Sequence, residues 1–420
     1  MGVAAPRKVV VIGAGIVGVC TASFLLRDGH HVVLIDPDEP GRGASFGNAG
    51  GLNSASIVPM SMPGIVWNVP KWLTDPMGPL SIRWHYLPTL TPWLVRFVRA
   101  GTPERVEATA RTLRSLLRPC LEKLLPLVKE AGALDLIHQR GGLFVYRSSD
   151  ALAKNSAGFE LRRRHGVVCE ELNADRIHQL EPDLSREYRR GVLIRENSHT
   201  SNPHRLVLSL AQAFARAGGE IACCKAQNFI LQGDRLRAVK TDAGEIAADR
   251  AVLTAGIYSR PLARLLDDAV PLESERGYHV MIRNPEAAIQ FSVMDGDGKF
   301  VATPMEGGLC VAGTVELAGL DAPPNWHRAR VLLDHARRML PGLSATYDSE
   351  RVSMWMGHRP SLPDSLPVIG RSRRSPDVIY AFGHGHVGMV AAPMTGAVIT
   401  DLLAARAPAI DVTPFRANRF

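Results

Sequence analysis

Three glycines near the N-terminus have the spacing that brings a backbone against a phosphate group. Gly13, Gly15 and Gly18 form a GxGxxG motif directly after the apolar run 8–12. The first glycine permits a tight turn, the second a close approach to a pyrophosphate, and the third close packing of helix on strand. Asp36 ends the next apolar run, where an acidic side chain bonds ribose hydroxyls and disfavours a 2′-phosphate. The pattern predicts a site for FAD or NAD; the alternative is a glycine turn in an unrelated α/β protein.

A second glycine-rich stretch, GRGASFGNAGGLN, covers residues 41–53. Glycines and small polar residues let several backbone N–H groups converge on one ligand. A flexible surface loop explains the same composition equally well, so this stretch alone does not identify a site.

Two motifs near the C-terminus, WMGHRPSLPDSLPVIG and YAFGHGHVGMVAAPMTG, are dense in proline and glycine. Arg359 precedes Pro360, and its guanidinium can hold a carboxylate by two parallel hydrogen bonds; an ordinary surface arginine is the alternative. His384 and His386 alternate with glycines, and no Cys, Asp or Glu stands at metal-ligand spacing beside them. We expect these histidines to line a planar cofactor or its substrate, and we expect no metal site.

The elements that must position these residues follow from hydrophobic periodicity. Residues 8–36 read as strand, glycine turn, helix and strand, which is a βαβ unit. Residues 40–64 read as a long loop, and residues 104–131 as helix interrupted by Pro119 and Pro126. A helix should begin at Asn202-Pro203 and end at Gly218, followed by a three-stranded meander. Residues 268–315 look strand-rich, 325–340 helical, and 378–405 repeat a strand, a glycine turn and a helix. The chain therefore leaves the nucleotide domain and returns to it.

Composition excludes several classes of protein. The 420 residues carry a net charge of +8 and are sufficient for two or three compact units. The basic residues are scattered and lack the interleaved aromatics of a nucleic-acid groove, so no nucleic-acid partner is expected. The six cysteines show no CxxC or zinc-ligand spacing, which indicates a reducing compartment.

No run reaches about 18 apolar residues, so any membrane contact should be peripheral. Trp84, Trp93, Leu94 and Phe97 fit either such a contact or, as we favour, a helical lid.

Taken together, the motifs resemble a known family. VVVIGAGIVG with Asp36, SFGNAGG, TAGIYS, ERGYH and the two C-terminal motifs occur in one order. They resemble the D-amino-acid oxidase superfamily of FAD-dependent oxidoreductases, most of all the small subunits of bacterial D-amino-acid dehydrogenases. The resemblance implies an α/β fold, with a Rossmann-like FAD-binding domain and an inserted substrate domain of antiparallel sheet and helices. The FAD-binding domain would comprise residues 1–56, 196–265 and 350–420, and the substrate domain residues 57–195 and 266–349.

The resemblance also implies which residues meet the cofactor. In related enzymes that attach FAD covalently, a histidine stands where this chain has Asn48, so FAD should be bound non-covalently. The implied cofactor-binding residues are Gly13, Ala14, Gly15, Ile16, Gly18, Asp36, Ser45, Asn48, Ala49, Gly50, Gly51, Gln227, Thr254, Ala255, Gly256, Gly383, His384, Gly385, Val387, Gly388 and Met389.

The implied reaction is oxidative deamination of a small D-amino acid or cyclic secondary amino acid. Hydride would pass from Cα to flavin N5, and water would hydrolyse the imine. Arg359 would hold the carboxylate, with Tyr278, His386 and Phe300 as further candidates for substrate contact. Glycine oxidases carry a tyrosine and a second arginine where this chain has Phe300 and His386, which leaves the substrate open.

Other functions remain open at this point. A sarcosine or glycine-type amine oxidase differs only in substrate, a tRNA-modifying FAD oxidoreductase would use the basic surface, and a non-enzymatic flavoprotein would have no amine substrate. The expected partners are an amino acid and an electron acceptor, either oxygen or a respiratory carrier. The expected location is the cytoplasm, and peripheral contact at the inner face of the membrane is an open alternative.

Overall fold

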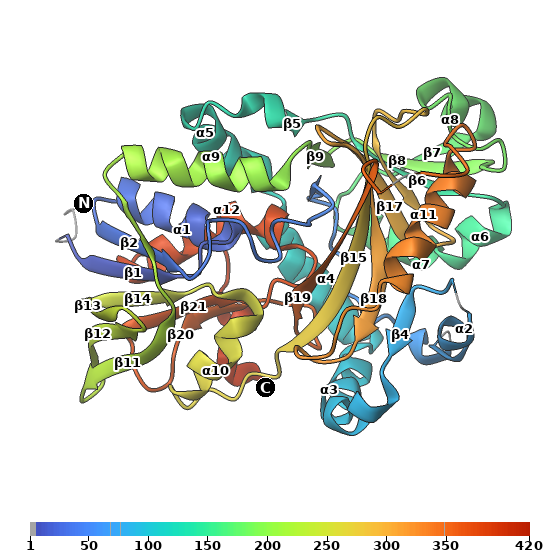
Figure 1. Ribbon diagram of the computed structural model, residues 1–420. Coiled ribbons are helices and arrows are strands. Elements are labelled where there is room, and N and C mark those ends of the chain that lie inside the picture. The colour runs from blue at the N-terminus through green and yellow to red at the C-terminus, as the bar shows by residue number, and fades with distance from the viewer. Residues whose placement is uncertain (1–5, 68, 76, 348) are drawn as a thin grey trace.

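The computed structural model describes residues 6–67, 69–75, 77–347 and 349–420. Its elements gather into two lobes that lie side by side, each built on its own large sheet (Figure 1). The long strands β15 (Glu273–Ile282) and β19 (Val352–Ser361) run between the lobes, at the centre of the view.

The first lobe contains a six-stranded sheet of order β10-β2-β1-β14-β21-β20. Its strands are β1 (Lys8–Ile12), β2 (His31–Asp36), β10 (Glu220–Cys223), β14 (Arg250–Leu253), β20 (Val368–Arg371) and β21 (Val378–Phe382). All neighbours pair in parallel except β20 and β21. Strands from three separate regions of the chain thus share one sheet. This confirms the prediction that the chain leaves the nucleotide domain and later returns to it.

Both faces of this sheet are covered, which explains the continuous apolar run of β1. Val9 and Val11 face helices α1 (Ile16–Arg27), α9 (Pro203–Arg216) and α12 (Gly388–Leu403), while Val10 and Ile12 face the opposite side. That side is covered by the antiparallel meander β11 (Ala226–Gln232), β12 (Arg235–Thr241) and β13 (Gly244–Ala247), with α10 (Ser259–Arg264) and the 3-10 turn η4 (Gly256–Tyr258) nearby.

The second lobe contains a nine-stranded sheet. The path β19-β15-β18-β17-β16-β6-β8-β7 is joined by β4, which pairs with β18. Its further strands are β4 (Leu80–Ile82), β6 (Gly142–Tyr146), β7 (Glu170–Asn173), β8 (Arg190–Ile194), β16 (Ser292–Asp295), β17 (Phe300–Met305) and β18 (Gly308–Leu317). Helix α11 (His327–Met339) packs on one face, and the opposite face of β15 and β19 looks toward the first lobe (Figure 1).

Strand β19 differs from the expected division of the chain. Residues 350–361 were assigned to the FAD-binding domain, but β19 pairs with β15 along its whole length and so lies in the substrate-side sheet. The other domain boundaries remain predictions.

The remaining elements complete the two lobes. Helices α4 (Pro103–Leu117) and α5 (Cys120–Glu130) pack against the core of the first lobe, and β3 (Gly51–Leu52), β5 (Ile137–His138) and β9 (Ser198–Thr200) form a small sheet beside it. The other helices are α2 (Val69–Thr74), α3 (Leu87–Ala100), α6 (Ser149–Lys154), α7 (Ser156–Arg164) and α8 (Ala174–Leu180).

The predicted helix cap and one of the two predicted proline interruptions are confirmed. Asn202 caps α9 as predicted, because its side chain accepts a hydrogen bond from the Arg205 N–H. Pro119 separates α4 from α5, but Pro126 does not interrupt α5. Trp93 is 6% exposed and stacks on Phe97, since α3 packs it against the second lobe, so a membrane contact through this side chain is wrong. The helical lid stays a prediction.

Candidate active site

The glycine turn between β1 and α1 leaves no room for side chains. Gly13 has φ +106°, and a Cβ there would lie 2.8 Å from the carbonyl of Thr254. A Cβ on Gly18 would lie 1.7 Å from the Gly13 carbonyl oxygen. Both positions therefore require glycine. Thr254 closes the turn from β14 by donating its hydroxyl to the carbonyl oxygen of Ile12 or Gly13, each 2.8 Å away.

Polar groups converge at the N-terminus of α1. The Asp36 carboxylate accepts hydrogen bonds from the N–H groups of Ala14 (2.7 Å) and Asp38 (3.0 Å). Burial raises the pKa of Asp36, and these two N–H groups oppose that rise. The Ser45 hydroxyl accepts a hydrogen bond from the Ile16 N–H at 3.1 Å. A helix N-terminus with a hydroxyl in front of it is suited to an anion such as a pyrophosphate.

The loop that follows Ser45 is fixed to both lobes. The Gly47 carbonyl oxygen lies 3.0 Å from His279 Nδ1 on β15. The Asn48 side-chain oxygen accepts from the Gly50 N–H at 2.8 Å, and the Gly50 carbonyl accepts from the Thr200 N–H at 2.8 Å. These contacts join residues 47–50 to β15 and β9, whereas residues 42–44 are exposed. The flexible-loop alternative therefore does not describe residues 47–50.

The two C-terminal histidines occupy different environments. His384 is 4% exposed, its Nε2 lies 3.1 Å from the Thr395 hydroxyl, and burial lowers its pKa to about 3. His386 keeps an exposed surface, yet burial lowers its pKa to about 4, with Arg359 contributing. His386 stands in the turn between β21 and α12, and its pKa responds to the charge of Arg359. We therefore keep His386 as a candidate for substrate contact, while His384 packs against α12.

Arg359 on β19 and Arg276 on β15 lie on neighbouring strands, but their guanidinium groups differ in how many hydrogen bonds they make to the rest of the described chain. Arg276 is 0% exposed and donates to four backbone carbonyls, those of Gly319, Leu320, Ala322 and Pro323. Arg359 makes a single hydrogen bond to a described residue, at 3.3 Å to the Thr314 carbonyl. Burial lowers the pKa of Arg359 and Glu275 opposes that effect. Because a guanidinium has five N–H donors, Arg359 retains several for a ligand.

Tyr278 and Phe300 lie on the wrong face of the sheet for substrate. Each is 1% exposed. The Tyr278 hydroxyl donates to Glu316 at 2.5 Å and accepts from the Asn325 N–H at 2.9 Å, while Phe300 stacks on His335 of α11. Side chains alternate along a strand, so both residues point into the core behind the sheet. Their predicted contact with substrate is wrong.

The other predicted cofactor residues keep the expected positions along the chain. Ala255 and Gly256 follow β14, next to the glycine turn, and Gly51 begins β3. Gly383 and Gly385 have φ of +81° and +50° in the turn before α12, and Gly388 begins that helix. Val387 and Met389 are buried, whereas Gln227 is exposed on β11. The structure gives Ala49 no contact that tests its role.

Sequence reasoning missed four residues that border Arg359 on the same face of the sheet: Gly277, His279, Trp355 and Gly357. They stand in the motifs ERGYH and WMGHRP, already noted for other residues. Their importance comes from the pairing of β15 with β19, which places Gly277 opposite Gly357 and His279 opposite Trp355. A pairing register between strands more than 70 residues apart has no local signal.

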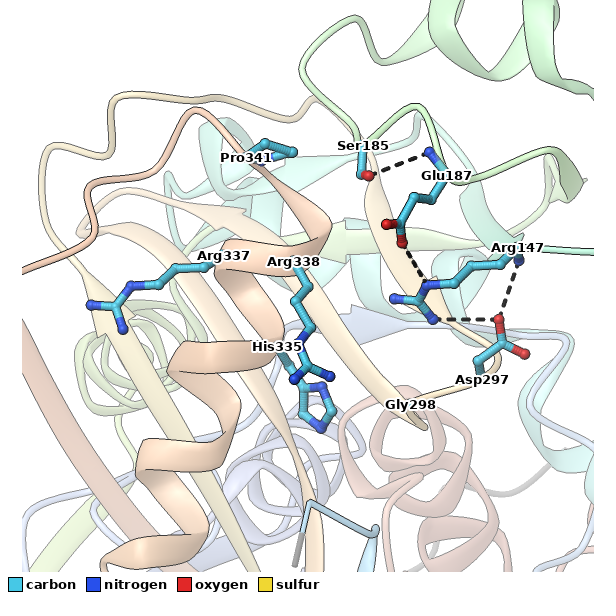
Figure 2. Close-up of a pocket in the computed structure, with 9 residues that line it drawn as sticks. All are labelled: Arg147, Ser185, Glu187, Asp297, Gly298, His335, Arg337, Arg338 and Pro341. Carbon is cyan, nitrogen blue, oxygen red and sulfur yellow. Dashed lines mark hydrogen bonds and ion pairs between the residues drawn. The ribbon is translucent and has the colours of Figure 1, made fainter.

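A separate hollow of about 580 Å³ lies behind the sheet, where His335 and Arg147 line it. Figure 2 shows Arg147 there between Glu187 and Asp297, which accept its hydrogen bonds. This hollow lies on the α11 side, where His335 stacks on Phe300, and it is not part of the candidate site.

The residues present fit a dinucleotide cofactor. Gly13 and Gly18 keep the turn tight, because a Cβ on either would collide with the backbone of Thr254 or Gly13. The Ser45 hydroxyl and the N–H groups of the turn collect at the α1 N-terminus, and Asp36 ends β2 beside them. These residues would hold the adenosine diphosphate portion.

Comparison with known proteins identifies the class. Residues 8–402 match the family described as FAD dependent oxidoreductase. The chain is 46% identical over 419 residues to a D-amino-acid oxidase of Bradyrhizobium diazoefficiens, with 99% of each covered. It is 33% identical to a D-amino acid dehydrogenase of Paramagnetospirillum magneticum, covering 98% of this chain and 99% of that one. The fold matches glycine oxidase from Geobacillus kaustophilus with a TM-score of 0.75 at 21% identity, covering 99% of both chains.

The chain belongs to the FAD-dependent oxidoreductase family. The suspected superfamily, the α/β fold with its Rossmann-like part, and FAD as the cofactor are thereby confirmed.

Proposed function

We propose that this enzyme oxidises the Cα–N bond of a small D-amino acid or cyclic secondary amino acid, and that Arg359 holds the substrate carboxylate. The observation that carries the proposal is the surplus of N–H donors on the Arg359 guanidinium, in contrast to the fully bonded Arg276. A desolvated cation with open donors is matched by a carboxylate, which accepts two parallel hydrogen bonds. The names of the relatives, a D-amino-acid oxidase and D-amino acid dehydrogenases, support the same substrate class.

The proposed role of the protein's side chains is to bind the substrate and to orient it. Arg359 would fix the carboxylate and thereby the direction of the Cα–H bond. His386 stays neutral above about pH 4, so it adds no second positive charge that would compete for the carboxylate. When bound, FAD would accept the two electrons and the hydrogen that leave Cα. A substrate that enters with a neutral amine needs no side-chain base for that step.

We further propose that FAD is held without a covalent bond. Asn48 stands where related enzymes with attached flavin carry histidine, and its amide oxygen is engaged with the Gly50 N–H. Such an amide lacks the nucleophilic ring nitrogen of histidine. Ser45, Ala14 and Ile16 would meet the pyrophosphate at the N-terminus of α1, and the N-terminus of α12 at Gly388 would face the flavin.

The substrate class is tested by anaerobic bleaching of the flavin absorbance near 450 nm. The panel comprises D-amino acids, their L enantiomers, D-proline, glycine and sarcosine. The proposal expects D-amino acids or D-proline to bleach fastest. Sarcosine or glycine as the fastest reductant would replace it with the amine oxidase alternative, and no bleaching by any member would refute it.

We also propose a cytoplasmic location with peripheral contact to an anionic membrane, and an electron acceptor that is either oxygen or a respiratory carrier. Among the described residues, no helix has both the length and the apolar character needed to cross a bilayer. The segment 60–100 exposes large apolar side chains beside Arg96 and Arg99, namely Trp67 (84%), Trp84 (69%), Val95 (43%) and Val98 (48%). Apolar side chains flanked by cations suit an anionic interface.

Vesicle binding tests this part separately. The protein should float with phosphatidylglycerol vesicles and not with phosphatidylcholine vesicles, and Trp84→Ser should weaken flotation. In the same samples, the rates at which oxygen and a soluble quinone reoxidise the reduced protein decide between the two acceptors. Equal recovery with both vesicle types contradicts the proposed membrane contact.

A further inference from the structure

Two glycines lie opposite each other where β15 and β19 pair. Gly277 on β15 is the cross-strand partner of Gly357 on β19. Both face the loop 45–51, because residues 355, 357 and 359 share one face of β19 and Trp355 contacts that loop at Gly47. Since paired residues lie about 4.5–5.5 Å apart, the two missing side chains leave one continuous hollow in the surface of the sheet.

Arg359 and Trp355 fill this hollow from its two ends. A Cβ on Gly277 would lie 2.3 Å from the Arg359 guanidinium carbon. A Cβ on Gly357 would lie 2.0 Å from the outer edge of the Trp355 indole. The guanidinium and the indole therefore lie over adjacent glycines. A carboxylate held by Arg359 has the indole as its neighbour along β19.

The indole is held in this position by two groups, the loop backbone at Gly47 and the His279 ring. A Cβ on Gly47 would lie 2.0 Å from Trp355, so the loop backbone lies directly against the indole. His279 stacks on the indole, with ring centroids 5.2 Å apart and planes inclined by 22°. His279 is itself anchored through Nδ1 to the Gly47 carbonyl at 3.0 Å, and burial keeps its pKa below the ordinary value. Trp355 therefore cannot turn aside without moving the loop.

We propose that Trp355 is a specificity-determining residue, whose indole forms the wall that limits the size of the group attached to Cα. The inference rests on the proposed function, because it takes Arg359 as the carboxylate anchor. A small side chain that lies beside the indole leaves the carboxylate on Arg359. A large one meets the ring and pulls the carboxylate away from Arg359.

The experiment compares D-alanine with D-phenylalanine in the FAD-loaded enzyme. The second-order rate constant for anaerobic flavin reduction is measured for the parent, Trp355→Ala and Trp355→Phe. The control is Trp326→Ala, since Trp326 is also a partly exposed tryptophan but contacts Tyr278 on the opposite face of the sheet. The ratio of D-phenylalanine to D-alanine should rise at least tenfold in Trp355→Ala, rise less in Trp355→Phe, and stay within twofold of the parent in Trp326→Ala.

A second measurement does not depend on turnover. Acetate and phenylacetate carry the same carboxylate with a small and a large substituent, and their dissociation constants follow from shifts in the flavin spectrum. Phenylacetate should gain at least tenfold over acetate in Trp355→Ala. Unchanged ratios in both measurements overturn the proposal that the Trp355 indole forms the wall. If Trp355→Ala fails to retain FAD, the same criterion applies to Trp355→Phe. A parent that no amino acid reduces contradicts the proposed function, and the acid titrations then still decide whether Trp355 bounds the site.

Discussion

Replacing Gly277 by alanine should disable the carboxylate anchor without touching Arg359 itself. The new Cβ would lie 2.3 Å from Arg359 Cζ and Nη2 and 2.5 Å from Nη1, whereas ordinary contact begins near 3.4 Å. The guanidinium must therefore move by roughly 1 Å. It is the end of a flexible side chain held by one 3.3 Å hydrogen bond, so it yields more easily than the paired strand does.

A displacement of this size has a predictable cost. Misplacing a positioning group by about 1 Å lowers a rate by on the order of 100-fold. Most of the loss should appear in the rate of flavin reduction by a D-amino acid. FAD retention and the melting temperature should change little, because a Cβ on Gly277 collides only with the guanidinium among its nearest neighbours.

Stopped-flow reduction under anaerobic conditions measures the loss. Gly307→Ala provides a matched control, since Gly307 lies in the turn between β17 and β18 and a Cβ there meets nothing nearer than 3.6 Å. The control should react within twofold of the parent. If Gly277→Ala is reduced as fast as the parent by the same amino acid, the guanidinium does not hold the carboxylate from the position seen in the structure.

Three further outcomes follow from the site. Acid or heat should release intact FAD into the supernatant, because Asn48 offers no covalent link; flavin that precipitates with the chain would contradict this. Asp36→Ala should weaken FAD binding by roughly 1–3 kcal/mol, since the carboxylate proposed to accept hydrogen bonds from the ribose hydroxyls is lost; unchanged affinity in an equilibrium titration would remove Asp36 from the site. The folded pKa of His384, about 3, lies below its unfolded value, so the unfolded chain binds more protons between these values and stability falls as pH falls through this window. Because of His384, the free energy of unfolding should be about 2 kcal/mol lower at pH 5 than at pH 7.5. Urea unfolding of His384→Asn should show a smaller pH dependence than that of the parent.

Local sequence chemistry predicted the cofactor end of the site well. The turn at Gly13 and Gly18 is specified by steric limits within one strand–turn–helix unit, and Asp36 ends the strand beside it. Asn202 likewise caps α9 through a contact three residues away. Such features depend on neighbours in the chain, and a single sequence contains that information.

The substrate end depends on which face of a strand is buried, which a single sequence does not show. Tyr278 stands in the motif ERGYH but points to α11, as Phe300 does, while Gly277 and His279 lie on the other face of the sheet. The sequence likewise contained no sign that the hydrogen bonds of Arg276 are filled by backbone carbonyls and those of Arg359 are not. That contrast depends on contacts between residues more than 40 positions apart in the chain.

The central claim is that Arg359 selects the substrate by its carboxylate. The most direct test measures anaerobic flavin reduction by a D-amino acid and by the corresponding amine without the carboxylate, in the parent, Arg359→Lys and Arg359→Leu. The parent should strongly prefer the acid. Arg359→Lys keeps the charge but loses the paired hydrogen bonds, so its preference should fall. In Arg359→Leu the preference should collapse, a loss on the order of 2–5 kcal/mol, while the protein stays yellow. Reduction of Arg359→Leu by the amino acid at the parent rate would show that the carboxylate is held elsewhere.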